Sequence, residues 1–340
     1  MQFQSLRRIW LWGTAALTLG AFTAAILLAP PGGSAPGTAL ESLLFLGTSV
    51  HVASTAWFYT VPEIRRHAGA HRARYVYAPV ALIAGGAVAA ARLPPETVRW
   101  ASLGFYGWQF WHFQKQNLGL AALAATATGT DRLGRRERTA IVAAGVFGIV
   151  ALVAHPELLQ VAVDSRLRWL FPAAALGYAL AVAFGIVLWA RRVRRCTWSA
   201  LAYVGSVLFF APVFAFRSPY AAVAGLTIAH GLQYVLIMSL IAGSTAAPRV
   251  RWLDSAAQSS GLRLLLFTNL AVVLGAVLTS ASHLHDGSAP GRALYGAFLG
   301  AVMAHFVIDA GLWRLRDEFP RRFLSSRLPY LLGGAGRASA

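Results

Sequence analysis

The chain has 340 residues, of which 57% are hydrophobic and only 12% are charged. Soluble domains carry about 25% charged residues, so this composition excludes a soluble globular protein and predicts an integral membrane protein. The formal net charge of +18 does not indicate nucleic-acid binding, because no polar segment is long enough to form a separate basic fold.

The apolar segments predict an all-α fold, a polytopic bundle of about ten transmembrane helices. Most segments reach the roughly 20 residues that a spanning helix needs. The expected helices are, in chain order, about 9–29, 38–61, 76–93, 97–126, 138–155, 167–190, 197–216, 219–242, 262–281 and 292–314. The first is expected to be a retained helix, because its apolar run is longer than that of a typical signal peptide.

The basic residues predict the orientation of these helices. Arginines gather in the connections after the even-numbered segments, whereas the loops 30–37 and 282–291 are nearly free of them. They include Arg65, Arg66, Arg135, Arg136, Arg191, Arg192, Arg321 and Arg322. The positive-inside rule therefore predicts a multi-pass protein of the cell membrane with both termini in the cytoplasm.

No segment between the apolar runs indicates a second domain. The longest connection, about 243–261, is too short to fold alone, so residues 1–340 are expected to form a single transmembrane domain. Residues 315–340 would be a basic cytoplasmic tail. The single Cys196 excludes an internal disulfide and any zinc or iron–sulfur site built from cysteines.

Four histidines lie inside apolar segments, and each has a polar residue four positions later. Imidazole is costly in hydrocarbon, so histidines at bilayer depth are functional candidates by default. Because residues i and i+4 share a helix face, the two side chains of each pair are expected to point the same way. The pairs are His51 with Thr55, His112 with Gln116, His230 with Tyr234, and His305 with Asp309. All four histidines lie on helices that would run inward at similar depth, so we expect them to converge.

Two rare charged residues accompany these histidines. Lys115 is the only lysine in the chain, and Asp309 is the only acidic residue deep in an apolar segment. An unpaired charge in the bilayer is costly. We therefore expect Lys115 and Asp309 to be buried close to each other, to a metal ion or to an ionic group of a substrate.

The histidines predict a metal centre. Imidazole ligands suit non-haem iron, copper and zinc, and a pair of histidines on facing helices suits haem. The expected metal ligands are His51, His112, His230 and His305, with Lys115, Asp309 and Tyr234 as catalytic residues. Substrate-binding residues would be Trp111, Gln116, Asn117, Gln233 and Thr55. The HxxxH and HxxHH clusters of polytopic desaturases are absent from the sequence, which argues against a di-iron site of that type.

Three functions fit these expectations. The first is a membrane oxidoreductase, with non-haem iron as the expected cofactor, that desaturates, hydroxylates or cleaves a hydrophobic lipid, isoprenoid or polyene, with a partner subunit as the electron donor where one is needed. The second is a haem- or quinone-linked electron-transfer subunit. The third is a proton-coupled transporter or an accessory membrane subunit. Against all three stands the simpler interpretation that the polar pairs are hydrogen bonds between packed helices.

The remaining histidines are weaker candidates. His283 and His285 have a spacing that can chelate a metal, but they lie in a loop rich in Gly and Pro, where histidines are usually solvated. His67 and His71 fall in a basic connection, and His155 lies at the end of a helix before a proline.

Overall fold

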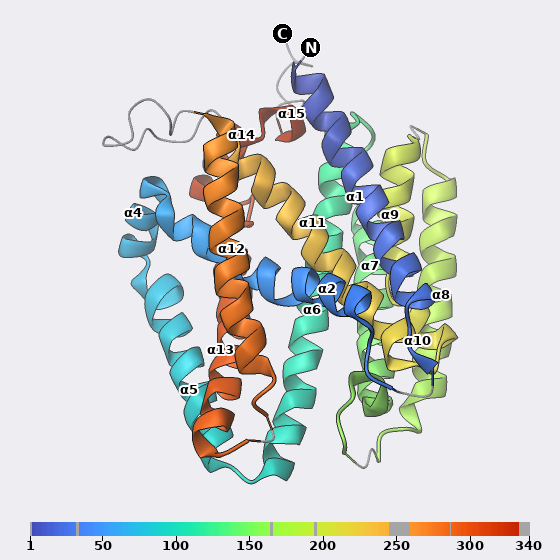
Figure 1. The fold of residues 1–340 in the computed structure, drawn as a ribbon. Coiled ribbons are helices and arrows are strands. Elements are labelled where there is room, and N and C mark those ends of the chain that lie inside the picture. The colour runs from blue at the N-terminus through green and yellow to red at the C-terminus, as the bar shows by residue number, and fades with distance from the viewer. Residues whose placement is uncertain are drawn as a thin grey trace. The chain divides into compact units, whose positions relative to one another are not determined.

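A computed structural model describes residues 2–31, 34–163, 166–193, 196–244, 259–285 and 287–332, and the regular elements in this part of the chain are all helices (Figure 1). They are α1 (Gln2–Leu27), α2 (Thr38–Phe45), η2 (Leu46–Val50), α3 (His51–Ser54), η3 (Thr55–Thr60), α4 (Pro62–Ala70), η4 (Ala73–Tyr77), α5 (Ala78–Arg92), α6 (Pro95–Ala127), α7 (Arg135–Ala154), η5 (Pro156–Leu159), α8 (Leu170–Ala190), α9 (Thr197–Leu208), α10 (Ala211–Ala215), η6 (Tyr220–Ala224), α11 (Gly225–Ala242), α12 (Ser260–Ser282), α13 (Ala289–Leu312), α14 (Glu318–Arg327) and α15 (Pro329–Leu332).

Seven helices of the described residues are long and apolar enough to cross a membrane. They are Phe3–Leu27, Ala73–Arg92, Arg135–Ala154, Leu170–Ala190, Tyr220–Ala242, Ser260–Ser282 and Ala289–Leu312. The predicted all-α class is confirmed, and the seven apolar helices are compatible with a multi-pass membrane protein. The count of ten spans and the placement of the termini stay predictions.

Three of the ten expected spans are not among these seven helices, and each has a local reason. Residues 38–60 are helical throughout, but the π-helical turn η2 and the 3₁₀ turn η3 interrupt the α-helix. The long helix α6 carries the polar run Gln114 to Asn117 at its middle. The segment 197–216 is broken into α9 and α10, where Pro212 begins a new helix.

The chain divides into two compact units. Unit 1 consists of Met1–Ser42, Arg99–His230 and Tyr330–Ala340, and unit 2 consists of Leu43–Val98 and Gly231–Pro329. The division falls inside α2, α6, α11 and α15, so each of these helices contributes residues to both units. The expectation of a single domain stays a prediction.

In unit 1, glycines admit large aromatic side chains between the helices. Helix α7 packs against α8, and α9 contacts both. A Cβ added at Gly148 would overlap the side chain of Phe210, and one added at Gly177 would overlap that of Phe147. The absence of side chains at these two positions lets the aromatic rings fill the space between helices.

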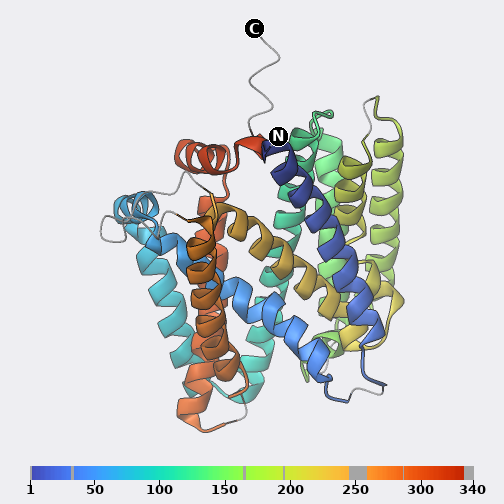
Figure 2. The same ribbon diagram turned by 45° about the horizontal axis from the view of Figure 1, so that its top comes forward.

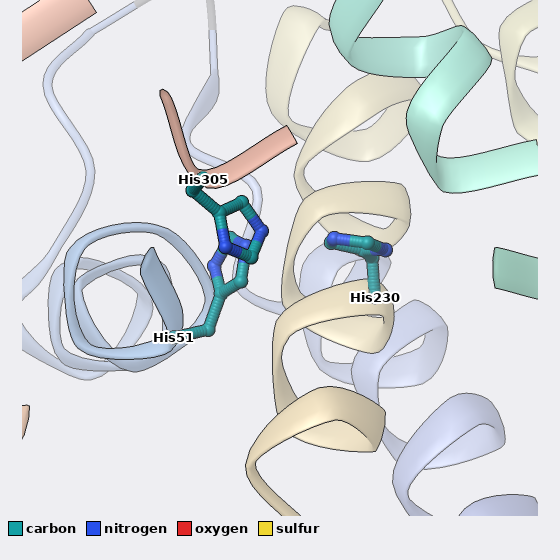
Figure 3. A group of neighbouring side chains, drawn as sticks. All are labelled: His51, His230 and His305. Atoms are coloured by element: carbon teal, nitrogen blue, oxygen red, sulfur yellow. The ribbon is translucent and has the colours of Figure 1, made fainter. Parts of the chain in front are cut away.

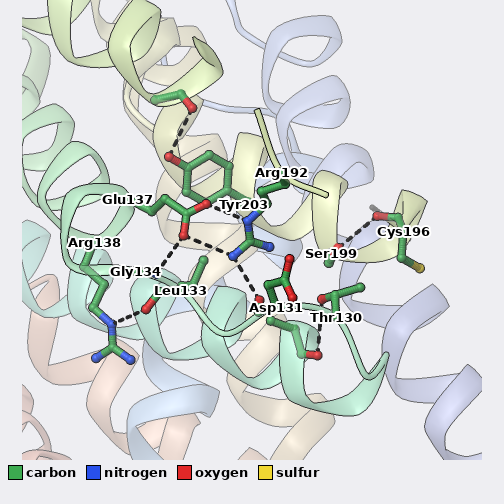
Figure 4. A network of polar contacts seen from close by, with 12 residues as sticks. Thr130, Asp131, Leu133, Gly134, Glu137, Arg138, Arg192, Cys196, Ser199 and Tyr203 are labelled. Carbon is green, nitrogen blue, oxygen red and sulfur yellow. Dashed lines mark hydrogen bonds and ion pairs between the residues drawn. The ribbon is translucent and has the colours of Figure 1, made fainter. Parts of the chain in front are cut away.

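A buried ion pair ties two loops of unit 1 together at one end of the α7–α8 pair (Figure 4). Arg192, which follows α8, donates from Nη2 to Glu137 Oε2 at 3.1 Å and to the backbone oxygen of Asp131 at 3.0 Å. The same carboxylate oxygen accepts from the backbone N–H of Gly134 at 2.7 Å, which caps the start of α7. Both charged side chains are nearly buried, with exposed fractions of 6% and 11%.

In unit 2, α5 and α13 pack backbone against backbone (Figure 2). A Cβ at Gly296 would lie 2.1 Å from the carbonyl oxygen of Gly86, and one at Gly300 would lie 2.4 Å from that of Leu82. Gly296 and Gly300 form a GxxxG motif, which allows the close helix approach that stabilises helix pairs in membranes. The position of α13 is therefore set largely by these glycines.

The end of unit 2 carries two short amphipathic helices, α4 and α14 (Figure 2). The basic tail expected over 315–340 contains α14 and α15, and its residues 333–340 lie outside the described part. Helix α14 buries Phe323 and Leu324 and exposes Arg321 and Arg322. This apolar face is too short for a hydropathy pattern to reveal.

Candidate metal centre

Close backbone contacts in unit 2 bring three helical segments together around the candidate site. A Cβ at Gly231 of α11 would lie 2.2 Å from the carbonyl oxygen of Gly47 in η2, and one at Gly275 of α12 would lie 3.1 Å from Cα of Val50. A Cβ at Gly231 would overlap the backbone of Gly47, and one at Gly275 would make a contact tighter than most Cβ contacts. These close approaches hold the segment that begins with His51 against α11 and α12.

His51 and His305 form a buried pair in unit 2. Their exposed fractions are 3% and 2%, and their ring centroids lie 5.0 Å apart with the planes at 82° (Figure 3). Tyr234 of α11 lies beside both, with ring centroids 5.9 Å from His51 and 5.2 Å from His305. Segments far apart in the sequence thus place two imidazoles and a phenol in contact.

A chain of hydrogen bonds leads from His305 to Asp309 through two hydroxyl groups. Thr55 Oγ1 lies 2.6 Å from His305 Nδ1 and 3.0 Å from the Tyr234 hydroxyl. Tyr234 in turn donates to Asp309 Oδ1 at 2.8 Å. All four side chains are buried, so this network is shielded from water.

Asp309, the acceptor at the end of this series of hydrogen bonds, determines which way the protons in the series point. If Asp309 is ionised, it can only accept hydrogen bonds, and the Tyr234 proton points to it. The Thr55 proton can then fill the remaining acceptor site on the Tyr234 oxygen, which requires His305 to donate from Nδ1. This is the arrangement in which all hydrogen bonds run one way and reinforce each other. It leaves Nε2 of His305 with a lone pair.

The histidine pair could hold a metal ion, and its rings lie closer together than two axial ligands with a haem between them. Metal–nitrogen distances of about 2.1 Å allow two imidazoles with nearby rings to share one ion, and His51 and His305 both belong to buried groups that could hold a metal. Two axial haem ligands would instead have ring centroids about 6 Å apart with the porphyrin between them. The hydrogen bond on Nδ1 of His305 is the kind of outer contact that orients metal-binding histidines.

Unit 1 contains a second histidine pair, His112 and His230. Their ring centroids lie 5.1 Å apart at 76°, and the His230 ring stacks on Phe113 at 3.9 Å. Gln116 donates from Nε2 to the backbone oxygen of His230 at 3.0 Å. The four histidines predicted from the sequence thus form two pairs, one within each unit.

Lys115 differs from the expectation. It is exposed, and its Nζ lies 4.9 Å from the centroid of the Trp111 ring, a cation–π contact one turn along the same helix. The expectation of a buried lysine is therefore wrong.

Asp309 has partners in its own unit, since Tyr234 donates to it and His305 Nε2 lies 3.7 Å from its Oδ2.

Asn117 belongs to a polar cluster between α6, α7 and α9 that the sequence analysis did not identify. It donates to Gln114 Oε1 at 3.2 Å, and Ser206 donates to its backbone oxygen at 3.1 Å. Gln114 also donates to the backbone oxygen of Ser206 at 3.2 Å. These contacts are those expected for hydrogen bonds between packed helices. The polar run 114–117 was visible in the sequence, but its facing partners were not.

The other candidates predicted from the sequence are Gln233, His283 and His285. Gln233 is buried on α11. His283 Nδ1 lies 2.8 Å from the backbone oxygen of Thr279, and the His285 ring lies 5.7 Å from that of Tyr295. Among the residues that the structure describes, neither His283 nor His285 belongs to a group of three side chains that could hold a metal.

Comparison of the chain with protein-family models, with curated proteins and with solved structures gives no match. The assignment of a function therefore depends on the geometry of the two units alone.

Proposed function

We propose that this chain is an integral membrane oxidoreductase that binds a redox-active metal ion, iron, through its buried histidines. The observation that carries the proposal is the His51–His305 pair, in which His305 is connected through Thr55 and Tyr234 to Asp309. If the histidines served only as hydrogen bonds between helices, one histidine would be enough. Two adjacent imidazoles, one of them held in a defined tautomer, favour a metal site.

His230 of unit 1 is a further ligand predicted from the sequence. His230 directly precedes Gly231, the residue in contact with Gly47, and it lies one turn before Tyr234 on the same helix face. The proposed ligands in unit 2 are therefore His51 and His305, and the pair His230 and His112 of unit 1 stay the further ligands predicted from the sequence. Three or four imidazoles suit non-haem iron, and copper and zinc are the alternatives.

Each polar side chain of unit 2 has a role in this proposal. Thr55 keeps the proton of His305 on Nδ1, so that Nε2 is available for the ion. Tyr234 aligns Thr55 and shields the carboxylate of Asp309. Asp309 supplies negative charge near a cationic centre and accepts the proton at the end of the chain. The metal, when bound, would activate O2 for reaction with the substrate.

The apolar setting favours a hydrophobic substrate, such as a lipid, isoprenoid or polyene. Of the oxidative reactions that suit such substrates, cleavage of a double bond by O2 balances without another reactant, since one C=C and one O2 give two carbonyl groups. Desaturation or hydroxylation needs two electrons from a partner. We therefore propose oxidative cleavage of a polyene as the reaction.

Elemental analysis of the detergent-purified full chain tests the metal. We expect about one iron ion per chain in the wild type and in His283→Ala, whose side chain lies outside the site, and less than about a tenth of that in His51→Ala and His305→Ala. The absorption spectrum should lack a Soret band. A wild type without metal, or variants that keep it, would refute the site.

Reaction of the iron-loaded protein with β-carotene under isotopically labelled O2 tests the chemistry. We expect two carbonyl products, with product formation lost in His51→Ala. If metal is bound but β-carotene and simpler polyenes stay intact, the metal site stands and the proposed reaction fails.

A further inference from the structure

A pocket of about 310 Å³ lies between α4 and α14 in unit 2, away from the histidines of the candidate metal centre. Its lining residues recur every three or four positions on each helix, so one face of each helix forms one wall. They are Glu63, Arg66 and His67 from α4, and Phe319, Arg322, Phe323 and Ser326 from α14.

Aromatic stacking and a buried arginine hold the two walls in place. The His67 ring stacks on Phe319 with centroids 3.9 Å apart and planes at 3°. Arg327, with an exposed fraction of 3%, lies behind the pocket, with its guanidinium 4.6 Å from the Phe323 ring and Nη2 3.5 Å from Glu63 Oε1. The pocket therefore has walls held by specific contacts and is not a gap between loosely packed helices.

The lining carries charges of both signs at separate places. Arg66 and Arg322 are exposed cations in the lining, and Arg322 also lies 3.7 Å from Glu318. The Ser326 hydroxyl donates to the backbone oxygen of Phe323, so the arginines are the principal donors. Glu63 has one oxygen toward Arg327, whereas its other oxygen, Oε2, is buried and accepts no hydrogen bond from the residues that the structure describes.

These groups match a zwitterion with a phosphate at one end and an ammonium at the other. Arginine recognises phosphate through paired N–H donors, and a buried carboxylate oxygen without a donor is costly unless a ligand supplies one. The two helices follow apolar helical segments after short connections and are amphipathic, as helices at the level of lipid headgroups are. We propose that this pocket binds a phosphoethanolamine group, with the phosphate at Arg66 and Arg322 and the ammonium at Glu63.

Binding of short-chain lipids to the detergent-purified full chain tests the ligand. We expect dioctanoyl phosphatidylethanolamine to bind at least about tenfold more tightly than the phosphatidylcholine or phosphatidylglycerol of the same chain length, because only its headgroup has both a phosphate and N–H donors. Equal binding of the three lipids would overturn the proposal. This comparison probes Glu63 without a substitution that would leave Arg327 buried and unpaired.

A second arm separates the lipid from soluble phosphate esters. If O-phosphoethanolamine binds as tightly as the lipid, the ligand is a soluble ester with the proposed chemistry, and if the lipid binds more tightly, the ligand is a membrane phospholipid. Failure of both compounds to bind would overturn the assignment.

Paired charge variants test the position of the phosphate. Arg66→Gln with Arg322→Gln should weaken phosphatidylethanolamine binding at least about tenfold. Arg65→Gln with Arg321→Gln removes the same charge from the preceding positions on the same helices, and these residues do not line the pocket. It should change binding by less than about twofold. Equal losses in the two double variants would mean attraction to surface charge in general, and the site would be rejected.

Discussion

Thr55 Oγ1 lies 2.6 Å from Nδ1 of His305, although 250 residues separate the two in sequence. This contact connects the segment that carries His51 to the helix that carries Asp309. With Asp309 ionised, it holds the His305 proton on Nδ1 and makes the other ring nitrogen a candidate ligand.

Thr55→Val should weaken iron binding without removing any ligand. The substitution keeps the shape of the side chain and deletes the acceptor for His305 Nδ1, and the loss of such outer contacts typically lowers metal affinity by about 10–100-fold. Thr55→Ser keeps the hydroxyl and should bind as the wild type does. Competition with a chelator measures the difference; equal affinity of the Val and Ser variants would show that the contact has no role in metal binding.

Tyr234→Phe should destabilise the protein more than a typical tyrosine hydroxyl deletion. It removes the donor to Asp309 Oδ1 and the partner of Thr55, and a buried polar group left without its partner costs about 1–3 kcal/mol, more when charged. Thermal unfolding in detergent measures the loss. Tyr295→Phe, on α13 but outside the network, is the control, and the same melting temperature for both variants would contradict the prediction.

Gly296→Ala should be destabilising, whereas Gly85→Ala should be neutral or stabilising. A Cβ at Gly296 would overlap the backbone of Gly86, but one at Gly85 meets nothing within 4 Å. Overpacking typically costs about 1–3 kcal/mol, while Gly→Ala at an open helical position gains about 0.5–1 kcal/mol. Melting temperatures of the two variants should move in opposite directions; a parallel shift would mean that α5 and α13 do not pack this closely.

Arg192→Met should lower the stability of unit 1 by about 3–5 kcal/mol, because breaking a buried pair leaves an uncompensated charge. Replacing both partners, as Glu137→Leu with Arg192→Met, should recover most of this loss. Limited proteolysis of the loop around Asp131, which Arg192 also contacts, reports the opening. If the double variant is no better than the single one, desolvation of Glu137 is not the cause.

His67 should make the stability of the protein sensitive to mild acid. Burial, and in second place the neighbouring His71, lowers the pKa of His67 below its ordinary value of 6.5. The unfolded chain therefore binds a proton more readily than the folded one, so stability falls as the pH drops below about 6.5 toward the folded pKa. His67→Gln should lose less stability than the wild type between pH 7 and pH 5; equal slopes in thermal unfolding would exclude His67 as the source.

The spacing of polar residues predicted which side chains share a helix face, and it did not predict the partners across the interface. His305 and Asp309, four positions apart, do lie close together. The bond from Thr55, however, goes to His305 and not to His51, and Tyr234 bonds to Asp309 and not to a histidine. Spacing determines which residues share a face, whereas the partner across the interface depends on helix rotation and on close contacts such as that of Gly47 with Gly231.

Rarity in composition was a weaker guide than periodicity. The uniqueness of Lys115 suggested a buried charge, but the turn of α6 that buries Phe113, Gln114 and Asn117 directs Lys115 outward.

The pocket between α4 and α14 was missed for a different reason. Each helix buries only a few apolar side chains among many arginines, and this pattern resembles a basic loop in a hydropathy analysis.

The pair of Glu137 and Arg192 also bears on the order of events during synthesis. Glu137 is made 55 residues before its partner, so the carboxylate has no Arg192 to pair with while α7 is being made. The Glu137 carboxylate can be buried against Arg192 only after α8 and the residues that follow it have been made. The ion pair therefore forms only when α7 and α8 lie side by side with these two ends together.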